Sequence, residues 1–594
     1  MAVVVGVGFA VYSRWFASTT SASSERLGHP TFFSSDSWGI DIAGLPSLLA
    51  VTAVGLGTAV LIALGFAVLR IARGWTSYRG YGFWCAAAVV ATVVVWPALV
   101  LGDHADEVWD KLRLEYPLSV QLPAALGAGT LIFAGAILLM PTLKAPNRIR
   151  QLPRRAVAVA AAAGVALSAG TVVVAVRAGD DGLHVDHITA TRVAVPALPS
   201  GLGPEKYRFA IPATETNSGA ADIADLVAAG TGFILSSPEG ITAYDGVTGA
   251  PRWHYLRTHT KDRGNHGLLY QAGSLRPLDG GAVVLAEWAT LGWTAFDAVT
   301  GEILWQKTDF TRDYTQAAEP ALRPALGVPG PWRAAVPLIL VDDNRIRGYD
   351  ARTGARRWST AITDSDARSH RVETVVTDTA IYRLAACSDD TSGWVTLTVL
   401  DAHSGAIVAS RELDRHPTTD RYDPFAHLEA LTNSVLVTWS FDNRQGSGTI
   451  LLRTPAQLAT ATPLDRRSRQ IIAADPAGPD VVISDYWTHD GSSPDRFAVL
   501  DTETGAEKYT LVGMEGWGKD PGHDLFLPDQ IIETSYSAGQ VLQAWSRADG
   551  RLLGSQPIAH PGQKCSNTPL RAVPGALLAV CVHKTTAELV GYPR

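Results

Sequence analysis

The chain has 594 residues, more than one ordinary domain holds. Its formal net charge is −7 at pH 7 and no Lys- or Arg-rich patch opposes that sign, which excludes nucleic acid as a partner. Apolar runs are concentrated before residue 180, whereas the remainder is polar and rich in Trp and Asp. Arginine greatly outnumbers lysine, a bias typical of bacteria with GC-rich genomes.

The first part, residues 1–178, contains long apolar runs. A membrane-spanning helix needs about 20 apolar residues, and four runs without a charged side chain meet this length, namely 44–69, 82–101, 119–140 and 156–176. Each is predicted to cross a bilayer. A fifth run, 2–16, is shorter, and is either a short first span or the remainder of a truncated helix.

The charges between these runs predict their orientation. The segments 70–81 and 142–155 are basic, whereas 102–118 is mostly acidic. Since basic loops stay in the cytoplasm, the last span delivers everything after about residue 178 to the outer side of the plasma membrane. No ionisable residue lies inside the four runs, which favours a multi-pass anchor in contact with lipid over a transporter.

Residues 179–204 are interpreted as a linker, and 205–594 as a second domain built from repeats. The strings "ITAYDGVTGAPRW", "WTAFDAVTGEILW" and "IRGYDARTGARRW" share an Asp-x-x-Thr-Gly turn and a following Trp. Weaker copies surround Asp401, Asp501 and Trp545, a decayed one lies near Arg453, and Tyr592 is in register with Tyr244. These positions give eight units of about 50 residues.

The repeated turn residues are predicted to serve the architecture rather than catalysis. Asp accepts hydrogen bonds from backbone amides two residues on, Gly permits a positive φ, and Trp offers a flat surface that docks on the next unit. The residues concerned are Asp245, Gly249, Trp253, Asp297, Gly301, Trp305, Asp350, Gly354, Trp358, Asp401, Gly405, Asp501 and Gly505.

Each unit shows alternating runs that predict four antiparallel strands, and four-stranded units around a ring form a β-propeller. The last unit ends after its third strand. A strand from the region 185–212, with "EKYRFAIPA" as candidate, is expected to fill the gap. Cys565 and Cys581 flank one hairpin arm of the last unit, and in an outward-facing domain they are expected to form a disulfide.

The Tyr/Phe-Asp-x-x-Thr-Gly-x-x-x-Trp string resembles the tryptophan-docking repeat of quinoprotein-like propellers. This family includes PQQ-dependent dehydrogenases and BamB-like assembly proteins. In the dehydrogenases, PQQ stacks between a Trp and a disulfide of adjacent cysteines, beside Ca²⁺. This chain has no Cys-Cys pair, and no motif for zinc, EF-hand calcium or phosphate binding was found. We therefore expect no cofactor, no metal site and no catalytic residue.

The sequence thus predicts an N-terminal helical membrane bundle followed by an eight-bladed, all-β propeller outside the cytoplasm. Its expected role is non-catalytic binding of a protein or cell-envelope ligand on a propeller face. Two alternatives stay open. One is a membrane dehydrogenase that uses PQQ and Ca²⁺, and the other is a sensor or transport accessory protein. Fold alone does not decide among them.

Overall fold

The structure is a computed structural model of the full chain. It describes residues 2–15, 45–73 and 121–144, isolated positions between 90 and 177, and most of 185–594. The longest gaps within the last range are 258–274 and 308–337. The chain divides into two compact units, a helical one that ends at Val185 and a β one that follows it.

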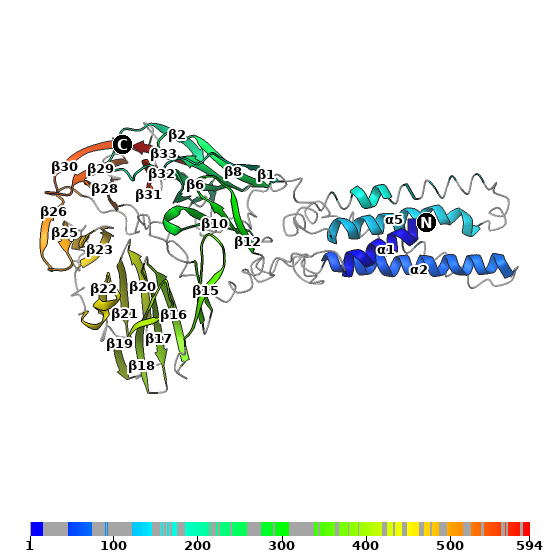
Figure 1. Ribbon diagram of the computed structural model, residues 1–594, viewed down its shortest axis with the longest axis horizontal. Helices are drawn as coiled ribbons and strands as arrows, with labels where there is room; N and C mark the ends of the chain where they lie inside the picture. The colour runs from blue at the N-terminus through cyan, green and yellow to red at the C-terminus, as the bar shows by residue number, and fades with distance from the viewer. Residues whose placement is uncertain are drawn as a thin grey trace. The chain divides into compact units, whose positions relative to one another are not determined.

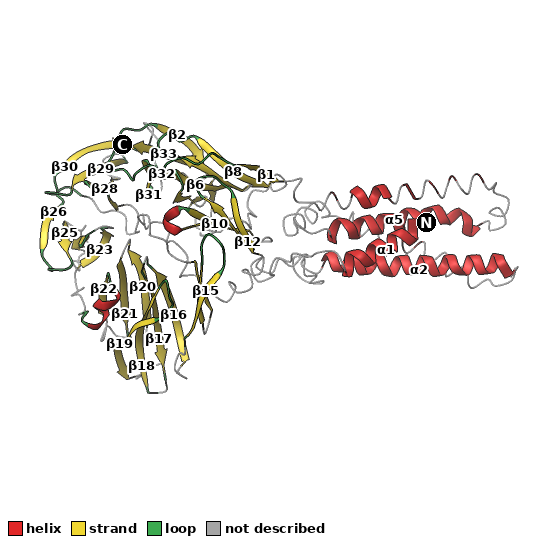
Figure 2. Cartoon of the chain, in the orientation of Figure 1, coloured by secondary structure: helices red, strands yellow, loops and turns green. Residues whose placement is uncertain are grey.

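The helical unit contains α1 (Ala2–Trp15), α2 (Leu45–Arg73) and α5 (Gln121–Lys144) among its described residues (Figure 2). They pack through small side chains, since Ala10, Ala53 and Ala128 are completely buried. α2 and α5 coincide with the predicted spans 44–69 and 119–140. The spans 82–101 and 156–176 lie, apart from isolated positions, outside the described residues.

Among the described residues, none of the helices combines the length and the apolar character needed to cross a membrane. The predicted multi-span membrane region is therefore not supported by this structure.

The β unit is an eight-bladed propeller, which confirms this part of the predicted fold (Figure 1). Neighbouring strands within each blade are antiparallel, and the first strands of successive blades contact one another, as β5 does with β9 and β31 does with β5. The first strand of each blade is thus the innermost and the fourth the outermost.

The first four blades follow the repeat closely. Blade 1 has β5 (Leu226–Ala229), β6 (Gly232–Ser237), β7 (Gly240–Asp245) and β8 (Pro251–Arg257). Blade 2 has β9 (Leu275–Leu278), β10 (Val283–Trp288), β11 (Gly292–Asp297) and β12 (Ile303–Lys307). The described strands of blade 3 are β13 (Leu338–Asp342), β14 (Arg345–Tyr349) and β15 (Arg356–Ala361). Blade 4 has β16 (Arg368–Val376), β17 (Ala380–Ser388), β18 (Ser392–Asp401) and β19 (Ile407–Pro417).

Blade 5 departs from the repeat where the sequence is weakest. Its described strands are β20 (Phe425–Leu431), β21 (Ser434–Ser440) and β22 (Gly448–Leu452), and the 3₁₀ helix η7 (Pro455–Ala459) follows β22. Thr454 and Gln457 form a capping box, and Pro455 begins the helix. These residues favour a helical start over a fourth strand immediately after the turn.

The last three blades are regular. Blade 6 has β23 (Arg469–Ala474), β24 (Asp480–Asp485), β25 (Phe497–Asp501) and β26 (Glu507–Thr510). Blade 7 has β27 (Asp524–Phe526), β28 (Gln530–Ser535), β29 (Val541–Ser546) and β30 (Leu552–Pro557). Blade 8 has β31 (Leu570–Val573), β32 (Ala576–Val582) and β33 (Ala587–Pro593).

The ring is closed by the N-terminal end of the β unit. β2 (Tyr207–Ile211), which lies in the segment that the sequence assigns to this gap, pairs antiparallel with β33 as the fourth strand of blade 8. A short hairpin, β3 (Ala213–Glu215) with β4 (Ala221–Ile223), follows it. Closure in this way removes an open sheet edge between the two ends of the chain.

The segment 179–204, interpreted as a linker, contains one short strand, and the residues after it lie along the propeller without regular secondary structure. β1 (Val185–Ile188) adds a fifth strand to blade 1 beside β8. Residues 189–206, called the strap here, then cross to blade 8 with backbone hydrogen bonds along the way. The amide of Ala190 donates to the carbonyl of Thr300, and the amide of Asp529 donates to that of Ser200.

Two faces of the propeller follow from this topology. The turns between the third and fourth strands, which carry Asp-x-x-Thr-Gly, share one face with the turns between the first and second strands. We call this the turn face. The strap lies on the turn face, because its hydrogen-bond partners Thr300, Asp529 and Gly575 all belong to turns of these two kinds. The opposite face, the loop face, carries the connections between blades.

Candidate functional site

The Asp of each repeat turn closes its own turn. In the turns of Asp245, Asp297, Asp350, Asp401 and Asp501, the carboxylate accepts hydrogen bonds from the amides two and three residues further on. In the same turns the Gly has a positive φ, for example 77° at Gly301. These side chains hold the backbone, and the described residues show no substrate-facing role for them.

The Trp that follows the turn in blades 1, 2 and 3 docks on the turn of the next blade. The indole nitrogen of Trp253 donates to the carbonyl of Ala298 at 3.0 Å, and its ring lies on Gly301, where an added Cβ would come within 2.7 Å of the indole. Trp305 meets Ala351 and Gly354 in the same way, and Trp358 lies on Gly405. Gly is therefore required in the turn both for φ and for this close approach.

Tyrosine replaces tryptophan at two further seams. Tyr509 lies on Gly550 and donates to the carbonyl of Arg547 at 2.8 Å. At ring closure, Tyr207 lies on Gly249 and donates to the carbonyl of Gly246 at 2.8 Å. Burial, with the nearby Asp245 carboxylate, raises the pKa of Tyr207 above its ordinary value, so the phenol stays protonated and able to donate.

The seam between blades 4 and 5 is held without such an aromatic residue. Arg411 donates to the carbonyls of Leu458 and Ala461 at 2.8 and 3.0 Å. On the inner strands, the buried Glu373 accepts from the amide of Leu428 at 2.7 Å and contacts the imidazole of His427 at 3.0 Å. Polar contacts therefore hold blades 4 and 5 together, whereas docked aromatic rings hold other neighbouring blades together.

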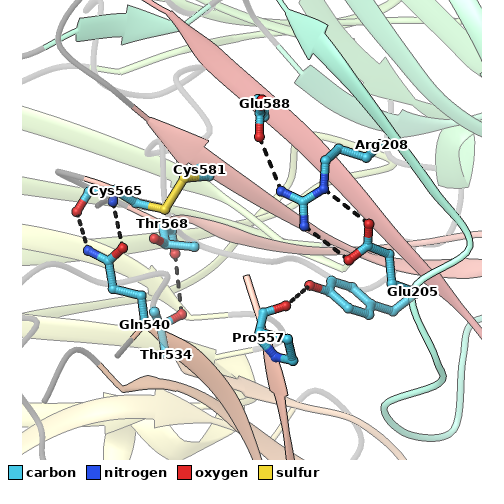
Figure 3. The surroundings of a disulfide bond; sticks show 10 residues. Glu205, Arg208, Thr534, Gln540, Pro557, Cys565, Thr568, Cys581 and Glu588 are labelled. Carbon is cyan, nitrogen blue, oxygen red and sulfur yellow. Dashed lines mark hydrogen bonds and ion pairs between the residues drawn. A yellow bond between two sulfur atoms is a disulfide. The ribbon is translucent and has the colours of Figure 1, made fainter. Parts of the chain in front are cut away.

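The seam between blades 7 and 8 contains the disulfide (Figure 3). The sulfurs of Cys565 and Cys581 are bonded, and both residues are buried. Gln540 of blade 7 donates to the carbonyl of Cys565 and accepts from its amide, both at 2.6 Å. The disulfide fixes the segment before β31 to β32, and Gln540 fixes the same segment to blade 7.

This disulfide does not fit the PQQ site that the family resemblance describes. Its cysteines are 16 positions apart, and they are buried in a hydrophobic cluster of blades 7 and 8. Within the described residues, His, Cys, Asp and Glu side chains form no group that could hold a metal ion.

The strap is tied to blade 2 through one of the repeat aspartates. Arg192 donates to Asp297 at 2.6 Å, and Arg352 of blade 3 approaches the same oxygen at 3.4 Å. Burial alone would raise the pKa of Asp297, but the hydrogen bonds from Arg192 and from the amides of Thr300 and Val299 hold it below its usual value. Asp297 thus connects the strap, blade 2 and blade 3.

The most distinctive surface is the end of blade 4 on the loop face. β17 has 9 residues, whereas the equivalent β6 of blade 1 has 6, so the blade 4 hairpin is about 10 Å longer at about 3.3 Å per residue. Asp389 caps it by accepting from the amides of Thr391 and Ser392, both at 2.7 Å. The hydrogen bond from the Thr391 hydroxyl, with those two amides, lowers the pKa of Asp389.

Aromatic and charged side chains cover this extension, and we call them the tip cluster: Trp394, Glu412, Asp414, Arg415, His416, Trp439 and Phe441. The Arg415 guanidinium stacks over Trp394 at 4.4 Å and makes two hydrogen bonds to Glu412, at 2.8 and 2.7 Å. This pairing lowers the pKa of Glu412. Arg415 is held in one orientation while about 45% of its side chain remains exposed.

The second half of the cluster belongs partly to blade 5. Trp439 donates to Asp414 at 3.1 Å, His416 contacts the same carboxylate at 3.2 Å, and the rings of His416 and Phe441 lie 4.7 Å apart. Rigid, partly exposed Trp and Arg side chains are the residue types that dominate protein-binding surfaces. The cluster is thus suited to binding, and its pairs show no nucleophile activated by a base.

Sequence reasoning missed the tip cluster, the strap contacts and Gln540. One signal for the tip was present, because "AIYRLAACSDDTSGWVTLTVLD" holds two long runs on either side of a short polar turn. The charged partners come from the outer strand and two aromatic partners from blade 5, and the repeat pattern does not predict that they meet.

These observations define the chain as a β-propeller protein with aromatic docking between blades. The family model described as outer membrane protein assembly factor BamB matches residues 237–552, more than half of the chain. The chain therefore belongs to that family.

Two solved structures are similar at a low level. One is dihydro-heme d1 dehydrogenase NirN in complex with DHE, with a TM-score of 0.34 and 13% identity over 64% of this chain and 79% of that one. The other belongs to the mitotic checkpoint complex, with a TM-score of 0.31 and 10% identity over 69% of this chain and 99% of that one. No curated protein matches the chain.

Proposed function

We propose that this chain is a membrane-anchored scaffold whose propeller binds a protein partner outside the cytoplasm through the tip cluster of blade 4. The observation that carries the proposal is the partly exposed Arg415–Trp394 stack on a hairpin longer than its blade 1 counterpart. Membership of the BamB family supports a binding role.

The membrane part of this proposal rests on the sequence. Four uncharged apolar runs and the charges of the segments between them support an anchor with the propeller outside the plasma membrane. The test is flotation of the full chain with vesicles after an alkaline carbonate wash, together with protease access to the propeller in intact cells. Release by carbonate would contradict the anchor, and protection from protease would contradict the outward orientation.

The binding role is tested by site-specific photo-cross-linking in cells. A photoreactive residue at Thr391, in the tip turn, should form a discrete adduct that disappears with Trp394→Ala or Arg415→Ala. Thr353 is a matched control, because it lies in an exposed Asp-Thr turn on the opposite face and its hydroxyl also donates to the Asp. Equal adducts at Thr391 and Thr353, or none at Thr391, would contradict the role of the tip.

We also propose that the propeller works without PQQ, since neither the disulfide nor the described acids fit that cofactor. The full chain is titrated with PQQ in the presence of Ca²⁺, and cofactor absorbance and melting temperature are followed. We expect no saturable binding. Saturation with a rise in melting temperature would instead favour the dehydrogenase alternative.

A further inference from the structure

The outermost strand of blade 7, β30, is exposed along most of its length. Its sequence is LLGSQP, and its first four residues are all exposed. Because successive side chains of a strand point to opposite faces, both faces of β30 are open. One cause is Gly554, which stands where blade 3 has Trp358, and none of the described atoms lies within 4 Å of a Cβ built on it.

β30 also lacks the charges that normally keep a sheet edge from pairing with another chain. Charged residues occur in each of the other fourth strands that the structure describes, namely β2, β8, β12, β15, β19 and β26. β30 has none, and only Pro557, its last residue, lacks an amide. Leu552 and Leu553 are the second and third residues after the turn glycine of blade 7. Blade 3 has Arg356 and Arg357 at these positions.

The backbone of β30 directs hydrogen-bonding groups away from its own blade. Opposed residues of an antiparallel pair alternate between bonded and non-bonded pairs. The amide of Ile558 donates to the carbonyl of Gln540, so Gln556, two residues earlier, also belongs to a pair that is bonded to β29. Ser555, next to Gln556, therefore directs its amide and its carbonyl away from β29.

Blade 1 shows that an outer strand of this propeller accepts a further strand. There β1 pairs with β8 as a fifth strand and covers its edge. The sheet of blade 7 ends at β30 among the described residues, and β30 lies at the rim of the ring (Figure 1). Blade 7 thus presents the kind of edge that is covered in blade 1.

We propose that β30 pairs antiparallel with β30 of a second copy of this chain, across a two-fold axis that joins the two blades 7 into one sheet. A second copy fits because an antiparallel strand edge is complementary to itself, and because an uncharged strand places no like charges opposite one another. Cover for Leu552 and Leu553, each 46% exposed, adds to the backbone hydrogen bonds. This inference rests neither on the tip cluster nor on the membrane anchor.

The test uses two differently tagged forms of the full chain, produced together in cells with a photoreactive residue at Ser555. After irradiation, adducts are captured through one tag and probed for the other, and mass spectrometry identifies the cross-linked peptides. Ser359 of blade 3 is the matched control position, because it is also an exposed serine five residues after the turn glycine. We expect position 555, and not position 359, to form an adduct that carries both tags and maps to β30 of the second copy.

Leu552→Arg together with Leu553→Arg copies the charged pair of blade 3 onto β30. This change should reduce the adduct at least about tenfold, since like charges that face one another destabilise strand pairs. Ile407→Arg together with Val408→Arg changes the equivalent aliphatic pair of blade 4 and should leave the adduct unchanged. Circular dichroism of the purified full chains verifies that both variants are folded.

An adduct between position 555 and a different protein would overturn the inference, because the edge would then bind another partner. Equal adducts at 555 and 359, or none at 555, would also overturn it, as would an adduct that persists in the arginine variant of β30. Cross-linking at Thr391 reports the proposed binding role of the tip cluster separately, so that the failure of one proposal is distinguished from the failure of the other.

Discussion

The glycine of a repeat turn can meet two demands, a positive φ and the close approach of an aromatic ring, and two of the turns separate them. Gly301 and Gly505 have nearly the same φ, 77° and 71°. Trp253 lies on Gly301, whereas none of the described atoms lies within 4 Å of a Cβ built on Gly505. The difference arises because β22 of blade 5 is followed by η7 and supplies no docking tryptophan.

Gly301→Ala should therefore destabilise the propeller more than Gly505→Ala. Both substitutions place Ala in the left-handed region, at a cost of about 1–2 kcal/mol, but only the first forces the Trp253 ring away from the turn. The melting temperatures of the two variants, measured by circular dichroism, test this difference in stability. Equal decreases would show that tryptophan docking does not constrain this position.

Asp297 gives the turn face an acid-sensitive contact. Its carboxyl pKa is lowered in the folded state, so its contribution to stability is complete above the unfolded value of about 3.9 and is lost as the pH falls through the lower folded value. Asp297→Asn should lower the melting temperature at pH 6, and the difference from the wild type should shrink below pH 4. Glu302→Gln, an exposed change in the same turn, serves as control. A difference that does not vary with pH would contradict the role of the ion pairs.

At the scale of the element, the seam between blades 7 and 8 depends on a covalent bond. The outer strand of blade 7 has Gly554 four residues after Gly550, where blades 1, 2, 3 and 6 have an aromatic ring, and nothing lies within 4 Å of a Cβ built there. The disulfide and the Gln540 clamp hold the segment before β31 instead.

Replacing both Cys565 and Cys581 by Ser should lower stability by about 3 kcal/mol, the value expected for a closed loop of about 15 residues. The loss should appear as faster amide exchange in β31 and β32, whereas β6 and β7 of blade 1 keep their protection. Hydrogen exchange with mass spectrometry resolves these segments. A uniform change over all blades would show that the bond does not act locally.

Elements with a strong local signal could be predicted from sequence, and elements defined by distant partners could not. The alternation of apolar and polar residues predicted the strands of "GAVVLAEWATLGWTAFD", and the Asp-x-x-Thr-Gly turn predicted the spacing of the units. Both signals depend only on residues that are close together in the chain. The strap has no periodicity and contains Pro196 and Pro199. Its order comes from turns such as that of Thr300, more than one hundred residues away, so its sequence resembles that of a linker.

The same dependence on distant partners explains why the candidate site could not be predicted from the sequence. Trp394 and Arg415 are 21 positions apart in the chain and meet only because β18 and β19 pair in register. The partner of Asp414 is Trp439 of the next blade. No spacing rule links these residues, whereas the disulfide could be proposed because both cysteines flank one predicted hairpin arm.

At the scale of the whole molecule, the ring is closed by residues close to opposite ends of the propeller sequence. β2 pairs with β33, Arg208 bonds Glu588 across 380 positions, and Tyr207 docks on the turn of blade 1. Tyr207 therefore contacts both blade 8 and blade 1, and its removal should destabilise both blades. Truncation of a fully buried aromatic ring to Ala costs about 3–5 kcal/mol, and the partly buried Tyr207 should cost less.

We expect Tyr207→Ala to reduce amide protection in β33 and in β7 at once, while β17 and β18, half a ring away, change little. Tyr207→Phe keeps the ring on Gly249 and loses only the hydrogen bond to Gly246, so it should retain most of the protection. Hydrogen exchange on the three proteins measures this pattern. If Tyr207→Ala loosened only blade 8, β2 would be an accessory strand of that blade rather than the closure of the ring, and the first and last blades would have to be held together by contacts such as that between β31 and β5.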